Sequence, residues 1–177
     1  AAIEKIKLLN GEQVPFLDQI LERYLDKVEL NIEIKGDSVL LAEKVRDVLQ
    51  RYPNSQDRVI VSSFEVNPLL YFWQKQPDIK RACLFGRYVR WPFFSVASVL
   101  NFTNAVNASI VHPWTHLIDQ NFMDQAASRG WKVFTYSEMN DEKSKNPEKI
   151  WSRLVALGVD GHCSNYPGEF RRWLDSH

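Results

Sequence analysis

Two charged side chains stand two residues apart in a segment that is otherwise typical of a β-strand. The segment VELNIEIKG covers residues 28–36 and carries Glu33 and Lys35 among aliphatic residues. Because successive side chains of a strand point to opposite faces, the two charged groups share one face and the aliphatic groups share the other. A carboxylate can ligate a divalent cation, and an ammonium group can contact phosphate oxygens. The spacing therefore predicts a site for a phosphorylated small molecule.

The same pair has a structural alternative. Glu33 and Lys35 could form an ion pair inside a barrel and serve only to hold the fold together. Removing water from two charges is costly, so an interior pair without another duty is the less favourable interpretation.

Other side chains that could do chemistry follow the remaining strand-like segments. Functional groups gather at the carboxyl ends of strands in repeated βα folds, so we expect these groups to surround one mouth. His112, Phe64 and Phe134 are the candidate substrate contacts, although a satisfied histidine and a core aromatic residue are the alternatives for His112 and Phe134. After Lys35, the residues at the carboxyl ends of the predicted strands are Ser62, Ser63, Phe64, Phe85, Arg87, His112, Trp114, Phe134, Tyr136, Ser164, Asn165 and Tyr166.

The elements that must position these residues alternate along the chain. Short β-rich runs are predicted at 28–34, 58–64, 79–86, 107–113, 132–137 and 158–166. Amphipathic helices are predicted at 16–25, 38–52, 67–76, 119–130, 147–158 and 168–177, with a further helical stretch within 93–106. Gly130 and Gly158 stand where a helix must end, and the charged stretch 140–149 is expected to be a solvated loop and helix start.

Repeated βα units form either an open doubly wound sheet or a closed (β/α)8 TIM barrel. The open sheet would favour a glycine-rich phosphate loop after an early strand, and the chain of 177 residues has only seven glycines and no such loop. Six strands are too few to close an eight-stranded barrel. We expect one α/β domain over residues 1–177 that resembles six-eighths of a barrel.

Composition excludes several classes of protein. Hydrophobic residues make up 45% and charged residues 25% of the chain, as in globular proteins, which argues against disorder. Twenty-two basic residues balance twenty-two acidic ones, so the charge gives no case for binding nucleic acid or an anionic membrane. The chain opens without Met or a signal-peptide pattern, which suggests a processed or trimmed product.

The two cysteines, Cys83 and Cys163, fall inside predicted strands. A disulfide between them is one interpretation, but two buried free thiols are favoured, and with them a reducing compartment such as the cytoplasm. A periplasmic or membrane-associated location stays open. No Cys/His spacing indicates a zinc site.

At this point the residues match a known family. NGEQVPFLDQIL, LNIEIKG, DRVIVSSF and PDIKRACLF, followed by VHPWTHLID, GWKVFTYSEMND and LVALGVDGHCSNYP, resemble the glycerophosphodiester phosphodiesterases in order and spacing. The resemblance implies a (β/α)8 barrel of the phospholipase-C-like phosphodiesterase type. It also implies hydrolysis of glycerophosphodiesters to an alcohol and glycerol 3-phosphate, with a divalent metal, Mg2+ or Ca2+.

The resemblance also implies roles for single residues. Glu33 matches the third metal-binding carboxylate of the family, and Lys35 matches the lysine beside the phosphate. Phe134 stands where the family has a Trp or Tyr that lines the pocket, and Ser137 replaces the usual Asn of that motif. His112 lies at the end of the strand where the family places variable substrate contacts.

The family motifs that precede Glu33 are absent. The family has a His-Arg motif on a first strand, an acidic metal-binding pair on a second strand, and then a second catalytic histidine, and none of these occurs here. We therefore expect the first two βα units, with both acid–base histidines, to be missing from this chain. On its own the chain is expected to be inactive and, with open sheet edges, to form homo-oligomers or to be poorly soluble.

Two further hypotheses stand beside an active enzyme in the complete protein. The chain could be a non-catalytic barrel remnant that binds a phosphorylated ligand or a partner protein. It could instead bind a lipid surface through the segment GRYVRWPFFSVASVLNF, residues 86–102, which is rich in aromatic and basic residues. The simpler interpretation of this segment is a loop and helix packed over the barrel mouth.

Overall fold

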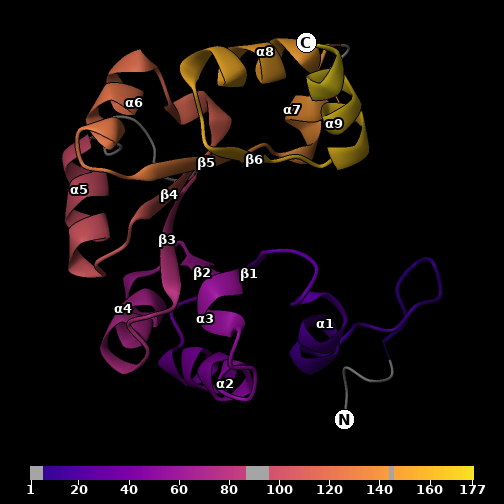
Figure 1. Ribbon diagram of the computed structural model, residues 1–177, viewed down its shortest axis with the longest axis vertical. Helices are drawn as coiled ribbons and strands as arrows, with labels where there is room; N and C mark the ends of the chain where they lie inside the picture. Colours follow the sequence, from indigo (N-terminus) through magenta and orange to yellow (C-terminus); the bar gives the residue numbers. More distant parts are fainter. Residues whose placement is uncertain (1–5, 87–95, 144–145) are drawn as a thin grey trace.

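The computed structural model describes residues 6–86, 96–143 and 146–177. Arg87 and most of the segment 86–102 therefore lie outside the described residues. Six parallel strands form one sheet in the order β1-β2-β3-β4-β5-β6, which is also their order in the sequence. The sheet curls into half of a barrel with its helices on the convex side, and α1 and α9 lie on either side of the open part (Figure 1).

The strand predictions are confirmed in number and order, and the observed strands are shorter at their ends. Residues outside the sheet at one or both ends of each strand account for the difference. The strands are β1 (Leu30–Glu33), β2 (Val59–Ser63), β3 (Lys80–Phe85), β4 (Ile110–Pro113), β5 (Lys132–Tyr136) and β6 (Gly161–Cys163).

The predicted helices are also present, and the described residues add three short ones. The predicted set is α1 (Leu17–Tyr24), α2 (Val39–Leu49), α4 (Val66–Lys75), α5 (Val96–Ala105), α6 (Gln120–Ala127), α8 (Glu148–Leu157) and α9 (Pro167–Ser176). The unpredicted elements are α3 (Ser55–Arg58), α7 (Met139–Glu142) and a 3-10 helix at Thr115–Leu117. Helix α8 ends at Gly158, whose φ of +73° is a conformation that glycine adopts without a steric penalty.

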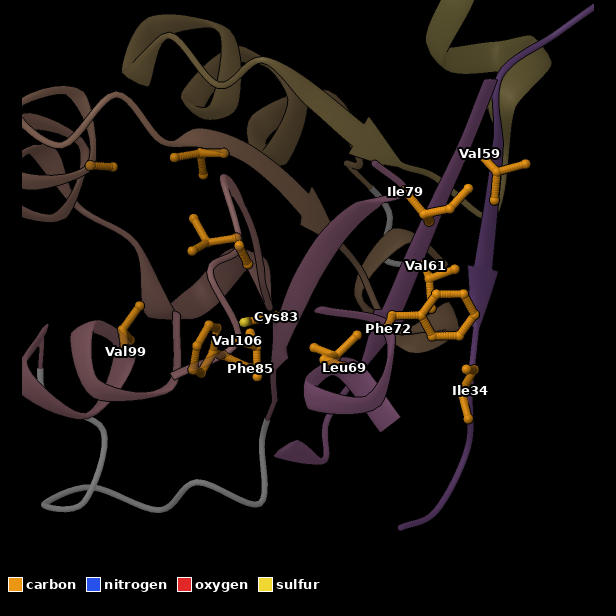
Figure 2. Packing of buried hydrophobic residues seen from close by; sticks show 14 of the residues in the cluster. Ile34, Val59, Val61, Leu69, Phe72, Ile79, Cys83, Phe85, Val99 and Val106 are labelled. Atoms are coloured by element: carbon orange, nitrogen blue, oxygen red, sulfur yellow. The ribbon is translucent and has the colours of Figure 1, made fainter. Parts of the chain in front are cut away.

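Alternation along the strands divides their side chains between two environments. Those on the convex face, such as Ile34, Val61 and Val111, are almost completely buried. They belong to one core cluster with helix residues that include Leu69 and Phe72 (Figure 2). This burial of apolar surface against the helices fixes the curvature of the sheet and leaves the concave face for other side chains.

A buried arginine holds the amino-terminal end of β3 and β4 together. Arg81 is only 6% exposed, and its Nε donates a hydrogen bond to the carbonyl of Val106 at 2.9 Å. Its two Nη atoms donate to the carbonyls of Pro77, Ile79 and Asn107 at 2.6–2.9 Å. These four bonds compensate for the burial of the guanidinium group and join the loops that precede the two strands.

Candidate active site

Glu33 and Lys35 lie at the carboxyl end of β1 and form an ion pair. The distance from Lys35 Nζ to Glu33 Oε1 is 2.8 Å. The side chain of Glu33 is 31% exposed and that of Lys35 is 80% exposed, so the pair is not enclosed in the interior as expected. The reason is its position at the mouth, on a strand that has a neighbour on one side only in the described sheet. Such an exposed pair stabilises the fold little, and the cost of burying two charges, which made the structural alternative less favourable, does not apply to it.

The ion pair borders a cavity of about 730 Å3, here called the mouth cavity. Most of the remaining wall is apolar and comes from β2, β3, α5 and β5. The mouth cavity is lined by Glu33, Ile34, Lys35, Gly36, Phe64, Glu65, Leu84, Phe85, Gly86, Ser98, Phe102, Tyr136 and Glu138. The lining combines aromatic carbon with Lys35 and with the carboxylates of Glu33, Glu65 and Glu138, so an anionic group of an organic molecule is favoured only beside Lys35.

Phe64 and Tyr136 meet edge to face at the mouth, with their ring centroids 6.3 Å apart. Gly86 lies under both rings, since a Cβ added there would be 2.7 Å from Tyr136 Oη and 2.9 Å from Phe64 Cε1. Burial, helped by the nearby carboxylate of Glu138, raises the pKa of Tyr136 to about 12. The hydroxyl therefore stays protonated at neutral pH and donates a hydrogen bond to the carbonyl of Phe85 at 3.4 Å.

A smaller cavity of about 160 Å3, the inner chamber, also lies on the concave face. Glu33, Phe64, Leu84 and Tyr136 line both cavities, which therefore adjoin. The residues that line only the inner chamber are Asn31, Ser62, His112 and Cys163. His112 is 1% exposed, and burial lowers its pKa to about 4, so its imidazole is neutral at pH 7.

The remaining candidates are divided between the site and the core. Phe134 is not among the residues that line the mouth cavity; it packs against the deeper cluster of Ile60, Ala82 and Ile110. Tyr136, two residues further along β5, provides the aromatic wall instead. Strand alternation explains why Tyr136 and not Phe134 lines the mouth cavity. Residues two apart on β5 face the same inward side, and Tyr136 is the one nearer to the mouth.

A buried polar cluster behind the mouth was missed by the sequence analysis. The carboxylate of Glu142 accepts hydrogen bonds from His162 Nε2 at 3.0 Å and from the backbone N–H of Asn165 at 2.6 Å. The side chains of Glu142 and His162 are 0% and 1% exposed. His162 Nδ1 is also 3.0 Å from Thr135 Oγ1. The cluster thus fastens the loop after β5 to the loop after β6.

The position of Glu142 corrects the expectation that residues 140–149 form a solvated stretch. A glutamate in a charge-rich segment gives no signal of burial, and the short helix α7 that turns it inward has no periodic pattern long enough to detect. Burial tends to raise the pKa of Glu142, but hydrogen bonds from His162, Asn165 and Ser164 outweigh it and lower the pKa below the ordinary 4.5.

The two thiols lie on different faces of the sheet. Cys83 is buried in the convex-face core, whereas Cys163 is exposed and lines the inner chamber. Both are free, as favoured from the sequence, but the expectation of two buried thiols is wrong for Cys163. Cys163 ends β6, which pairs only with β5 in the described sheet, and this edge position leaves it exposed.

The described residues do not complete a metal site. No group of three or more His, Cys, Asp or Glu side chains within residues 6–86, 96–143 and 146–177 is arranged to hold a cation. Glu33 alone is one carboxylate, and Mg2+ or Ca2+ requires about six or more oxygen ligands. In the same part of the chain, none of the helices has the length and apolar character to cross a membrane.

Comparison with curated proteins gives two relatives. The chain is 28% identical over 164 residues to YhdW of Bacillus subtilis (strain 168), an alignment that covers 89% of the chain and 61% of that protein. It is 24% identical over 159 residues to the glycerophosphodiester phosphodiesterase of Bacillus altitudinis, covering 87% of the chain and 60% of the relative. The chain thus spans about three-fifths of the length of these curated relatives.

Solved structures share the fold. A Galdieria sulphuraria structure aligns with a TM-score of 0.85 at 22% identity, over 98% of this chain and 69% of that one. An Oleispira antarctica phosphodiesterase in complex with the product sn-glycerol-3-phosphate aligns with a TM-score of 0.70 at 21% identity, over 93% and 63%. The model of the glycerophosphoryl diester phosphodiesterase family matches residues 2–169. The chain therefore belongs to the glycerophosphoryl diester phosphodiesterase family.

Proposed function

We propose that the protein hydrolyses glycerophosphodiesters to an alcohol and glycerol 3-phosphate, and that this chain provides the phosphoryl-binding side of the active site. The observation that carries the proposal is the Glu33–Lys35 pair at the edge of the mouth cavity. Family membership and the product-bound Oleispira antarctica relative support the same reaction class.

Each charged residue has a role in this proposal. Lys35, which is largely exposed, places its ammonium group where it can attract phosphoryl oxygens as negative charge develops on them. Glu33 is proposed as one ligand of a divalent cation, Mg2+ or Ca2+. The described residues supply no further ligand set, so we expect the chain by itself to bind either cation weakly.

The aromatic wall gives the substrate its orientation. Phe64 and Tyr136 present ring carbon beside the charged end of the mouth cavity. His112 contributes from the inner chamber as a neutral hydrogen-bonding group. Because His112 titrates far below neutrality, it is poorly matched to general acid–base catalysis at pH 7, and we assign it a binding role.

The phosphoryl site can be tested by titrating the chain with glycerol 3-phosphate in a calorimeter. Lys35→Gln should weaken binding about three- to tenfold, as expected for one exposed charge-assisted contact. Lys44→Gln removes the same charge from an exposed position on α2 and should leave the affinity unchanged. Equal affinities for the two variants would contradict the assignment of Lys35.

Catalysis by the chain alone is a separate question. We expect negligible turnover of glycerophosphodiesters by the 177-residue chain, with or without Mg2+ or Ca2+. Metal-dependent release of glycerol 3-phosphate would show this expectation to be wrong. Tight binding of glycerol 3-phosphate without turnover by the complete protein would instead favour a non-catalytic, ligand-binding barrel.

A further inference from the structure

Apolar side chains stay exposed around the mouth of the half-barrel. From β1 onward, six of the nine large apolar side chains that are exposed among the described residues lie in loops and helix starts that follow strands. Their exposed fractions lie between 40% and 64%. Because the carboxyl ends of parallel strands meet at one end of the sheet, these side chains surround the mouth. This group, here called the apolar rim, consists of Val39, Leu40, Leu41, Phe64, Val66 and Met139.

Two contacts join the parts of the apolar rim. Asn67 Nδ2 donates a hydrogen bond to Asp37 Oδ2 at 2.8 Å, which fastens the loop before α2 to the first turn of α4. The edge-to-face contact of Phe64 with Tyr136 reaches across to β5, and Met139 begins the helix that follows this strand. Phe64 also lines the mouth cavity, so the rim continues the wall of the cavity outward to the surface. Apolar groups gathered at a surface in this way mark a site of contact with a protein or a membrane.

The form of the apolar rim favours a lipid surface over a protein partner. Its members project from separate loops around an open cavity. A fluid lipid phase accommodates scattered apolar groups, whereas a protein interface requires one closely packed, complementary surface. A protein seated on the rim would also cover the entrance through which a substrate reaches Lys35. A lipid surface would instead present phosphate groups to that entrance.

The charges at the mouth select the kind of lipid. The side chain of Lys35 is 80% exposed and borders the mouth cavity, so its ammonium group can meet a lipid phosphate. Asp37 and Glu65 are also exposed at this end of the sheet, and their carboxylates oppose a surface with a net negative charge. A zwitterionic surface, such as one of phosphatidylcholine, is therefore favoured over an anionic one.

We propose that the apolar rim docks the mouth of the barrel onto a zwitterionic phospholipid surface, so that phosphodiesters held at that surface reach Lys35. The proposal rests on the proposed function for the reaction, whereas the docking depends only on the rim. It adds a substrate class to that function, namely glycerophosphodiesters that carry an aliphatic chain.

The first experiment measures flotation of the chain with phosphatidylcholine vesicles on a density gradient, where aggregated protein sinks and is not counted as bound. Combining Leu40→Gln with Met139→Gln should weaken binding about tenfold or more, since two apolar side chains lose their contact with lipid. The matched control combines Val155→Gln with Leu174→Gln, two exposed apolar positions on α8 and α9, and should bind as the unmodified chain does. Adding phosphatidylserine to the vesicles should not strengthen binding.

Several results would overturn the docking proposal. The unmodified chain could fail to float, the two double variants could lose binding equally, or binding could require phosphatidylserine. A rim variant that dissociates oligomers of the chain, when the unmodified chain binds no vesicles, would assign the rim to a protein interface and refute the lipid.

The second experiment tests the orientation on the vesicle. An environment-sensitive fluorophore is attached to Met139→Cys or, as a control, to Val155→Cys, each combined with Cys163→Ser so that the exposed native thiol does not react. Phosphatidylcholine vesicles should shift the emission to shorter wavelengths at position 139 and leave it unchanged at position 155. Equal shifts at the two positions would contradict docking through the mouth.

A soluble ligand separates docking from the proposed function. Leu40 and Met139 do not line the mouth cavity, so their double variant should bind glycerol 3-phosphate with unchanged affinity. An effect of Lys35→Gln on that affinity without any binding to vesicles keeps the phosphoryl site and refutes the docking. Binding to vesicles that depends on the rim, with no effect of Lys35→Gln on glycerol 3-phosphate, keeps the docking and refutes the phosphoryl contact.

Discussion

Replacing Glu142 with Ala should destabilise the fold strongly, although the residue touches neither cavity wall. The substitution removes a carboxylate that is completely buried and leaves His162 and the backbone N–H of Asn165 without their partner. The indole N–H of Trp151, 3.4 Å from Oε1, loses an acceptor as well. A buried donor left without an acceptor costs about 1–3 kcal/mol, and three donors lose theirs here, so we expect a loss of about 3–5 kcal/mol. The whole free energy of unfolding of a typical domain is only about 5–15 kcal/mol.

The measurement is urea denaturation followed by circular dichroism. Glu29→Ala is the matched control, because Glu29 forms an exposed ion pair with Lys80 at 3.5 Å and should contribute less than about 1 kcal/mol. Glu142→Gln keeps the side-chain shape and one acceptor, so its cost should be intermediate, about 1–3 kcal/mol.

The pH dependence provides a second test. Because the folded state lowers the pKa of Glu142 below 4.5, its stabilising contribution is complete above pH 4.5 and is lost as the pH falls through the folded-state value. The difference in unfolding free energy between the unmodified chain and Glu142→Ala should therefore shrink below pH 4.5. A difference that does not change with pH, or a Glu142→Ala cost equal to that of Glu29→Ala, would refute the reasoning.

Three further predictions concern the cavities and the sheet edges. Gly86→Ala places a Cβ 2.7 Å from Tyr136 Oη, so it should lower the free energy of unfolding by about 1–3 kcal/mol and reduce the affinity for glycerol 3-phosphate in calorimetry. In the control Gly168→Ala the added Cβ meets nothing closer than 3.8 Å, so neither quantity should change. Burial raises the pKa of both thiols, that of Cys83 to about 12, but only Cys163 is exposed. A thiol reagent should therefore modify Cys163 in the native chain and reach Cys83 only after urea is added, and native modification of both would contradict the assignment. Within the part of the chain that the structure describes, β1 and β6 each pair on one side only. The isolated chain should therefore associate in size-exclusion chromatography with multi-angle light scattering, and a stable monomer would argue against open-edge pairing.

Much of the fold can be predicted from sequence patterns that are strong and recur along the chain. Strands such as VIVSS at 59–63 are apolar on both faces, a pattern that parallel strands covered on both sides require, and the structure buries all five residues. Gly158 marks the end of α8 because it takes a conformation that other residues avoid. These features depend on local sequence, so sequence alone can predict them.

The site was predictable only in part. Alternation places Glu33 and Lys35 on one face and therefore predicts their pairing, but it gives no measure of their exposure. It also cannot decide that Tyr136 rather than Phe134 lines the mouth, since both face inward and the depth of the cavity decides between them. The Glu142–His162 contact joins residues that are 20 positions apart, and neither residue type signals burial.

The two ends of the sheet are fastened by different chemistry. Arg81 holds one end through backbone carbonyls, which do not titrate, whereas the loops at the other end are joined through a carboxylate that gains a proton in acid. Acidification below pH 4.5 therefore weakens the join between the loops after β5 and β6 and leaves the backbone bonds of Arg81 unchanged.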